Sequence, residues 1–369
     1  MCYIVVYQLR VEALGAGAVT TGVRALMNSH LRLDQRILVR PSKSLYAAEL
    51  LRNAFEPNLF IIGSMKSGTT YLYNLLASQP SIFMCRPKEP SYFVEPDQLR
   101  KLWPWGWEQG YCRNRERYVR LFQSAGTRTI LGEASVYYTH LPLASGVAER
   151  IHQFNPDARL IYVMRDPIER TISHYWHRVR HHREHRSLLP AIRDDSQYRD
   201  VSNYAMQLSP YLERFKQDQI KLLTFEELTG NTNETLRSIF RWLKLDESIA
   251  SVTIQPDNVT PEIVRKSIWM LHRLRQDNQL LCAAIDRLPS CVRRFGARML
   301  TREVDRRNVD ISEVVRYLRP LQQRQTEVLT KLIGREFPEW KTLYPRVTEQ
   351  FDRPVNLLVS RTNASGRKC

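Results

Sequence analysis

The segment of residues 63–70 carries side chains that bind anions. It reads GSMKSGTT and follows the apolar run Leu59–Ile62. A buried strand that feeds a glycine-bearing loop into a helix turns several backbone N–H groups toward one point, and the helix dipole favours negative charge there. Lys66 adds a positive charge, and the loop hydroxyls add donors. The alternative is an ordinary strand–helix turn with a hydroxyl cap, but a lysine inside the loop favours phosphate binding.

The position of this lysine separates the loop from the Walker form. In that form Gly-Lys-Ser/Thr closes a longer loop, whereas Lys66 precedes Gly68 by two positions. We therefore expect a nucleotide phosphate, and not a triphosphate with magnesium.

A second group of polar residues follows another apolar run, Arg159–Met164. Arg165 stands where the carboxyl end of a parallel strand would face a ligand crevice, and its guanidinium can fork onto a phosphate. Ser173, two helical turns further on, can donate to the same group. Asp166 has two interpretations: the cap of a helix that begins with Pro167, which we favour, or a magnesium ligand after a strand.

The elements that would position these residues alternate along the chain. Strands are predicted at 59–62, 128–132, 159–164 and 219–224. Helices are predicted at 71–76, 143–154, 167–182, 205–216, 234–243, 261–286 and 311–336. Such alternation predicts an α/β domain with a central parallel sheet flanked by helices on both faces. We place this domain at residues 58–345, between an N-terminal extension of unknown role (1–57) and a polar C-terminal tail (346–369).

The composition restricts the class of ligand and the cellular compartment that we expect. Of 55 Lys and Arg residues 44 are Arg, and the net charge is +17, which favours an anionic ligand. Nucleic acid is not expected, because no nucleic-acid-binding signature accompanies the charge. The six cysteines show no metal spacing; Cys282 and Cys291 could bridge, but reduced thiols are favoured. No signal peptide or membrane span is recognised, so we expect a cytoplasmic protein.

Taken together and in this order, the two motifs resemble the PAPS-binding motifs of sulfotransferases, which use 3′-phosphoadenosine 5′-phosphosulfate as sulfuryl donor. The resemblance covers about residues 57–342 and is to bacterial relatives of the heparan-sulfate and carbohydrate sulfotransferases. Four further segments carry it: 86–93 (RPKEPSYF), 132–138 (GEASVYY), 202–211 and 332–340. It implies a P-loop-NTPase-like three-layer domain. Because the membrane anchor common in the Golgi members is not recognised in this sequence, we expect a bacterial cytoplasmic protein and not a Golgi enzyme.

The resemblance also implies roles for individual residues. The 5′-phosphosulfate would be held by Lys66, Ser67, Gly68, Thr69 and Thr70, and the 3′-phosphate by Arg165 and Ser173. Glu89 would be the catalytic base and Lys66 would offset the charge of the leaving phosphate, with no metal required. The acceptor would be a hydroxyl of a carbohydrate, lipid or small metabolite, anionic ones included. The alternatives are a P-loop-type kinase or nucleotide hydrolase, and a polyanion-binding protein without catalysis.

The sequence departs from the heparan-type pattern in two places. Ala134 stands where those enzymes carry a lysine, and their C-terminal Lys-Gly nucleotide loop is not evident; Arg265-Lys266 or residues 293–296 could replace it. Two other clusters stay open. His177, His181 and His185 are spaced to share a helix face, as a metal site, a basic acceptor surface or a solvated face. Trp103, Trp105 and Trp107 either stack on sugars or pack in a lid, which we favour.

Overall fold

The computed structural model describes residues 56–247, 261–267 and 301–345 of the chain. Several sequence-based predictions lie outside the described residues: most of the N-terminal extension, the Cys282–Cys291 pair, segment 293–296 and the tail at 346–369. The domain boundaries therefore stay predictions.

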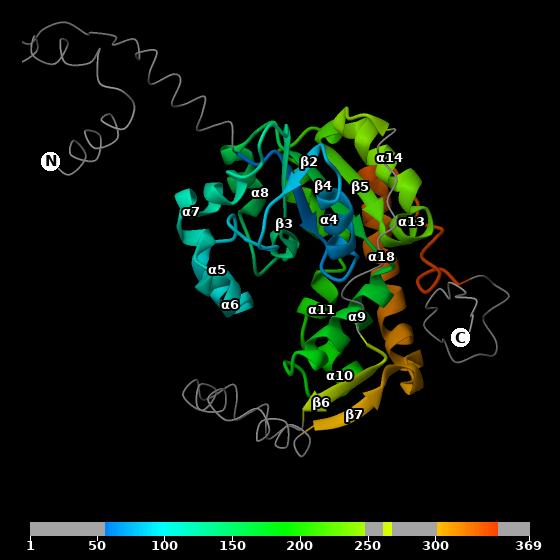
Figure 1. The fold of residues 1–369 in the computed structure, drawn as a ribbon. Coiled ribbons are helices and arrows are strands. Elements are labelled where there is room, and N and C mark those ends of the chain that lie inside the picture. Colours follow the sequence, from blue (N-terminus) through cyan, green and yellow to red (C-terminus); the bar gives the residue numbers. More distant parts are fainter. Residues whose placement is uncertain (1–55, 248–260, 268–300, 346–369) are drawn as a thin grey trace, which may run out of the picture. The chain divides into compact units, whose positions relative to one another are not determined.

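Five parallel strands form the central sheet (Figure 1). They are β1 (Leu59–Gly63), β2 (Ile82–Met84), β3 (Ile130–Ala134), β4 (Arg159–Met164) and β5 (Ile220–Thr224), in the spatial order β2-β3-β1-β4-β5. The four predicted strands are confirmed with shifts of one or two residues at some ends. The short edge strand β2 was missed, because three residues between two prolines carry too weak a pattern.

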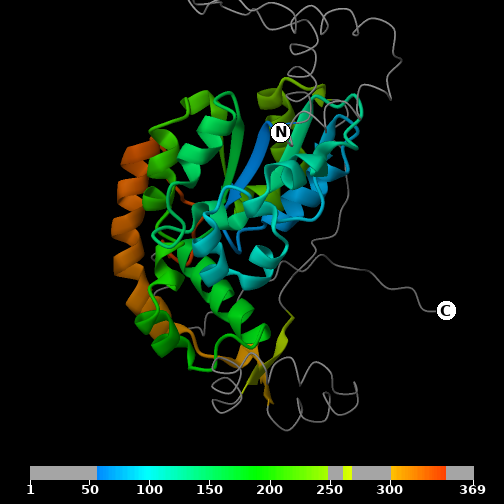
Figure 2. The same cartoon turned by 90° about the vertical axis from the view of Figure 1, so that its left-hand side faces the viewer.

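Alternating side chains of the strands enter two separate apolar clusters. Leu59 and Ile61 of β1 pack with residues of α4 (Thr69–Ala77) and α14 (Thr232–Leu243). Phe60 and Ile62 point the other way, into a cluster with residues of α8 (Val147–Phe154), α12 (Tyr204–Leu212) and α18 (Ser312–Ile333). Figure 2 shows α18 in orange and α4 in blue on opposite sides of the sheet. The predicted three-layer α/β arrangement is confirmed.

The remaining described helices surround the ends of the strands. They are α5 (Pro96–Leu102), α6 (Pro104–Glu108), α7 (Arg115–Val119), α9 (Pro167–Arg180), α10 (Leu188–Asp194), α11 (Gln197–Asp200) and α13 (Phe225–Gly230). Short 3₁₀ turns occupy Tyr111–Arg113, Arg120–Phe122, Val136–Thr139, Gln217–Gln219 and Arg306–Asn308. Two of these elements matter for the site: α9 begins where β4 ends, and the 3₁₀ turn Arg306–Asn308 follows the second strand of a hairpin.

This hairpin corrects a prediction. A helix was expected over residues 261–286, but Ile263–Ser267 forms strand β6, paired antiparallel with β7 (Thr301–Asp305). The pairing partner lies more than 30 residues further along the chain, so the local pattern does not report it. Val264 is buried at 3% exposure, and β6 packs against α9. Residues 268–286 lie outside the described part of the chain.

The order of the strands locates the ligand crevice. The connection after β1 runs to β2 on one side of the sheet, and the connection after β4 runs to β5 on the other. In open parallel sheets, ligands bind at the carboxyl ends of two adjacent strands whose connections diverge in this way. The Gly63–Gly68 loop and Arg165 therefore lie at the same switch point.

Candidate active site

The loop between β1 and α4 is held in place by its neighbours. The Ser64 amide donates to Val163 O at 2.9 Å, which fastens the loop to the end of β4. The hydroxyls of Ser64 and Ser67 lie 2.6 Å apart and both residues are fully buried. The Arg170 guanidinium donates to Met65 O at 3.4 Å. The Ser67 hydroxyl thus bonds within the loop in this structure, and its contact with the 5′-phosphosulfate stays a prediction of the sequence.

The first turn of α4 has no side-chain cap. The cap residue is Gly68, in the left-handed conformation with φ of 87°, so the hydroxyl cap predicted from the sequence is wrong. A Cβ atom at position 68 would lie 2.8 Å from the Phe225 ring. Because no side chain competes for them, the amides at the start of α4, with Thr69 and Thr70 as its first residues, can bond to an anion.

Lys66 lies half-buried in a cluster of positive charge. Burial, and then the neighbouring cations Arg165, Arg180, Arg306 and Arg170, lower its pKa from 10.5 to about 8. Within the part of the chain that the structure describes, Lys66 forms no ion pair. A cation kept among cations in this way has strong affinity for a multiply charged anion, which would replace repulsion with attraction.

Arg165 presents its guanidinium beside the loop. Its Nη2 donates to Glu169 at 2.8 Å and the group lies 4.6 Å from the centre of the Phe225 ring. The Tyr204 hydroxyl fixes its backbone, donating to Arg165 O at 2.7 Å and accepting from its amide at 3.2 Å. The buried Nε atom has no hydrogen-bond partner among the described residues. This donor could bond to an anionic oxygen, and the phosphate role of Arg165 stays a prediction of the sequence.

Asp166 has the structural role favoured from the sequence. One carboxylate oxygen accepts from the amides of Ile168 and Glu169 and caps α9. The other accepts from the amides of Thr342 and Leu343 at 2.9 and 3.0 Å, which fastens the segment after α18 to the end of β4. Burial raises the pKa of Asp166 to about 6. Both oxygens are thus used by the backbone.

One face of α9 turns toward the cation cluster. Arg180 and His177 both interact electrostatically with Lys66, and burial and Lys66 lower the pKa of His177 to about 3. Ser173 lies one turn before His177 on the same face and is half-buried, in agreement with its predicted place.

The histidine pattern is only partly helical. The helix ends at Arg180, and His182 has a positive φ of 56°, so His185 does not continue the face of His177 and His181. The rings of those two lie 4.5 Å apart. No group of three or more metal-binding side chains occurs among the described residues.

Two arginines of the site were not recognised from the sequence. Arg170 is fully buried and bonds to Ser202 and Tyr198. Arg306 joins the Lys66 cluster from the turn that follows β7. The position of Arg306 near Lys66 depends on the packing of β6 against α9. No local pattern in the sequence therefore distinguishes Arg306 from its neighbours. Of the two segments proposed for this role, Arg265-Lys266 lies within β6 and 293–296 lies outside the described residues.

Glu89 lies in the loop after β2. Its carboxylate pairs with Lys88 at 2.8 Å, it is half-buried, and its φ is 68°. Its charge raises the pKa of Tyr137, after the larger effect of burial, whereas Arg183 lowers it. Arg183, which acts on Tyr137, also acts electrostatically on His177, as Lys66 does.

Aromatic side chains border this region. Trp103 stacks on Tyr137 with ring centres 5.5 Å apart, in line with the favoured packing role. Arg113 lies 4.2 Å from the Trp107 ring centre, whereas Trp105 is 71% exposed. Trp105 is thus the member of the cluster that is open to an acceptor.

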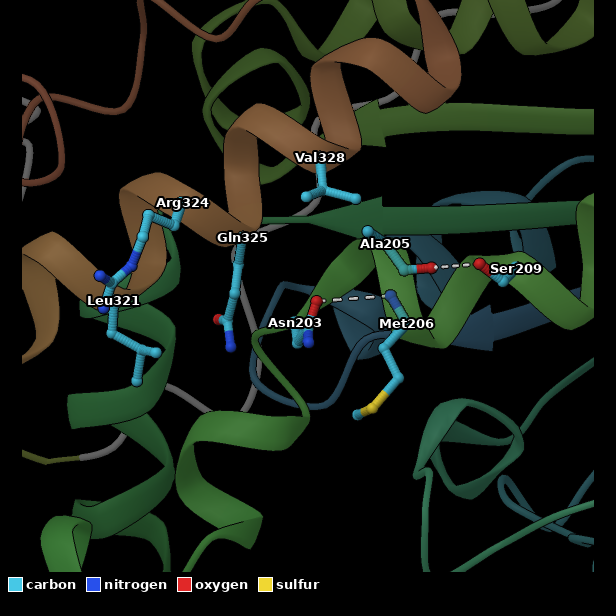
Figure 3. Close-up of a pocket in the computed structure, with 8 residues that line it drawn as sticks. All are labelled: Asn203, Ala205, Met206, Ser209, Leu321, Arg324, Gln325 and Val328. Atoms are coloured by element: carbon cyan, nitrogen blue, oxygen red, sulfur yellow. Dashed lines mark hydrogen bonds between the residues drawn. The ribbon is translucent and has the colours of Figure 1, made fainter.

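A groove of about 420 Å³ lies elsewhere, between α12 and α18 (Figure 3). Its lining residues are Asn203, Ala205, Met206, Ser209, Leu321, Arg324, Gln325 and Val328. None of the predicted site residues belongs to it, so it does not bear on the chemistry at the switch point.

Comparison with known proteins identifies the family of this chain. A family model described as "Sulfotransferase family" matches residues 57–248. The membrane-associated sulfotransferase kil1 of Dictyostelium discoideum is 34% identical over 119 residues, 32% of this chain and 22% of that protein. Human carbohydrate sulfotransferase 15 is 26% identical over 255 residues, 51% of this chain and 44% of the relative. The chain thus spans less than half the length of these curated relatives.

Among solved structures, a sulfotransferase from Alicyclobacillus acidocaldarius superimposes with a TM-score of 0.55 at 24% identity. The match covers 78% of this chain and 99% of that one. At this identity the similarity concerns the fold, and it confirms the predicted P-loop-NTPase-like three-layer arrangement.

Proposed function

The chain belongs to the sulfotransferase family, and from this premise we propose that it transfers a sulfuryl group from PAPS to an acceptor hydroxyl at the β1–β4 switch point. The observation that carries the proposal is the Lys66 cluster, where four arginines surround a lysine that has no ion-pair partner among the described residues. A donor with a 3′-phosphate and a 5′-phosphosulfate on its ribose would supply the negative charge that balances these cations.

The residues present fit such a donor. The uncapped first turn of α4 and Lys66 suit its 5′-phosphosulfate. Arg165, with its buried unpartnered Nε, and Ser173 suit the 3′-phosphate, and Arg306 and Arg180 add charge. The bound donor would supply an activated sulfuryl group on a phosphate leaving group.

The protein's own contribution is positioning and charge. Glu89 takes the proton of the acceptor hydroxyl as the new S–O bond forms. Lys66 offsets the charge that develops on the phosphate oxygen as the old S–O bond breaks. Lys88, which pairs with Glu89 in this structure, would have to yield the carboxylate to the acceptor. In-line alignment of the two partners supplies the rest of the catalysis.

The acceptor is proposed to be a carbohydrate hydroxyl, with anionic sugars favoured. Exposed Trp105 offers an aromatic surface, and Arg183 and His181 are exposed at the end of α9. No helix within the described residues is long and apolar enough to cross a membrane. A cytoplasmic location stays a prediction of the sequence, to be tested by fractionating cells that produce the full chain.

Transfer of labelled sulfate from PAPS to a panel of sugar acceptors tests this function. We expect transfer by the wild-type protein, loss of transfer in Glu89→Gln with nucleotide binding retained, and loss of both in Lys66→Ala. Absence of any thermal shift with millimolar adenosine 3′,5′-bisphosphate would exclude the proposal. Transfer that survives in Glu89→Gln would remove Glu89 as the base.

The competing kinase or hydrolase needs a triphosphate and magnesium. Undiminished sulfate transfer in EDTA would exclude it, whereas magnesium-dependent hydrolysis of ATP would favour it. A polyanion-binding protein without catalysis would bind heparin tightly at physiological salt and leave adenosine 3′,5′-bisphosphate unbound.

A further inference from the structure

Glu133, at the end of β3, is a fully buried carboxylate without a cation. Its Oε1 atom accepts hydrogen bonds from the Tyr118 and Tyr138 hydroxyls, both at 2.7 Å, and its Oε2 atom accepts from the Ser135 hydroxyl at 3.0 Å. No ion pair is formed by Glu133 within the described ranges of the chain. A buried charge of this kind is unfavourable for folding alone, because an apolar side chain would avoid its desolvation.

Two of these three hydroxyls also accept hydrogen bonds from backbone amides of the loop that carries Glu89. The Ser135 oxygen accepts the Ser91 amide at 3.0 Å, and the Tyr138 oxygen accepts the Phe93 amide at 3.4 Å. Each hydroxyl has one hydrogen, which it gives to Glu133, so its oxygen faces the loop only as an acceptor. The carboxylate thus sets the direction of the hydrogen bonds in two relays, Glu133–Ser135–Ser91 and Glu133–Tyr138–Phe93.

The loop needs such support because its backbone is strained. Glu89 and Ser91 have positive φ values of 68° and 51°, which L-residues adopt only where surrounding contacts hold them. Ser91 is fully buried, and its amide is the anchor of this segment closest to Glu89 among those that lead to Glu133.

We propose that Glu133 is a positioning residue for the catalytic base: through Ser135 and Tyr138 it holds the amides of Ser91 and Phe93, and so fixes the Glu89 carboxylate in the site. The inference rests on the proposed function for the role of Glu89. It adds a residue that touches neither donor nor acceptor.

The protonation of Glu133 gives the network a measurable signature. Burial raises its pKa to about 7, although the hydroxyls of Tyr118, Tyr138 and Ser135 lower it. Two other titratable groups act on it electrostatically, Glu89 from the loop and Cys85 after β2. A proton on Glu133 would turn one hydroxyl away and release its relay. We therefore expect wild-type kcat to fall as the pH decreases through about 7.

Three variants of the full chain test the proposal. Ser135→Ala cuts one relay, and Glu133→Gln replaces one acceptor oxygen by a donor. Tyr118→Phe is the matched control, because its hydroxyl bonds to Glu133 at the same 2.7 Å as Tyr138 but leads no further. All are compared at pH 9, where Glu133 is ionised in the wild type, by kcat, KM for PAPS, affinity for adenosine 3′,5′-bisphosphate and hydrogen exchange of the 89–93 amides.

We expect kcat to fall about 10²-fold in Ser135→Ala and Glu133→Gln, with KM and nucleotide affinity nearly unchanged. The Ser91 amide should exchange faster in both, and the fall of kcat near pH 7 should be absent from Glu133→Gln. Tyr118→Phe should lower Tm but keep kcat within about 3-fold of the wild type.

Equal losses of kcat in Ser135→Ala and Tyr118→Phe would overturn the proposal, because they would indicate a general structural role. If the wild type transferred no sulfate, the proposed function would fail, and hydrogen exchange would still decide the network. Ser135→Ala with an unchanged exchange rate at Ser91 would then overturn it.

Discussion

Lys66 lies beside four arginines at the end of β1, and its charge is the property that a ligand would change. In the free protein, burial and these neighbours hold its pKa near 8, against an ordinary value of 10.5. A bound dianion favours the protonated form of Lys66, so its pKa rises on binding. Proton uptake therefore accompanies nucleotide binding wherever the free lysine has begun to lose its proton.

We predict that adenosine 3′,5′-bisphosphate binds with proton uptake above pH 8, and that its affinity decreases as the pH rises from 8 to 10. Calorimetry at pH 9 in two buffers of different ionisation enthalpy measures the uptake directly. Lys66→Gln is the control, and it should bind more weakly without this uptake. An uptake that persists in Lys66→Gln would contradict the assignment.

The element that prepares the phosphate site is α4, whose first turn starts at a left-handed glycine. Gly68 meets two requirements at once: a φ of 87°, and the absence of a Cβ that would lie 2.8 Å from Phe225. The ring of Phe225 in turn lies against Arg165. Gly68 therefore links the start of α4 to Phe225, the residue that follows β5, and through its ring to Arg165.

Gly68→Ala should lower the free energy of unfolding by about 1–3 kcal/mol, from the left-handed backbone and from the contact with Phe225, and should weaken nucleotide binding. Urea unfolding and nucleotide titration measure both effects. Gly230→Ala is a matched control at the end of α13, where an added Cβ would meet no atom within 4 Å, and its stability should stay the same or rise. Unchanged stability in Gly68→Ala would contradict the argument.

At the scale of the whole molecule, the net charge is +17, and the described arginines differ in how they are paired with carboxylates. Many described arginines pair with carboxylates at the surface, such as Arg178 with Asp195 at 2.6 Å and Arg335 with Glu227 at 2.8 Å. The cations around Lys66 include Arg165, whose carboxylate partner Glu169 leaves the Nε atom unpartnered within the described residues. The folded protein is therefore expected to be stabilised by small multivalent anions at this one place.

We predict that 20 mM sulfate raises Tm by about 2–5 °C more than sodium chloride of equal ionic strength. This difference should be lost in Lys66→Ala, because it comes from anion binding at the Lys66 cluster, whereas general salting effects act on both proteins alike. An equal difference in the variant would place the stabilising anion elsewhere.

The sequence by itself determined most of the central strands and helices, and it predicted the two candidate nucleotide motifs. Strands such as Leu59–Gly63 and Arg159–Met164 carry apolar runs, and Pro167 marks the start of the helix that follows the second of them. These patterns involve residues close to one another in the chain, so they can be recognised from the sequence. The cap at Asp166 was predicted for the same reason.

Only the tertiary structure decided which residues complete the site. Arg306 reaches Lys66 because β6 pairs with β7 and packs against α9, and Glu133 reaches Ser91 through a hydroxyl 44 positions from that amide. The helix predicted across Ile263–Ser267 was wrong because this segment pairs with a strand far along the chain. Contacts between residues far apart in the chain depend on the packing of whole elements, and no local spacing encodes them.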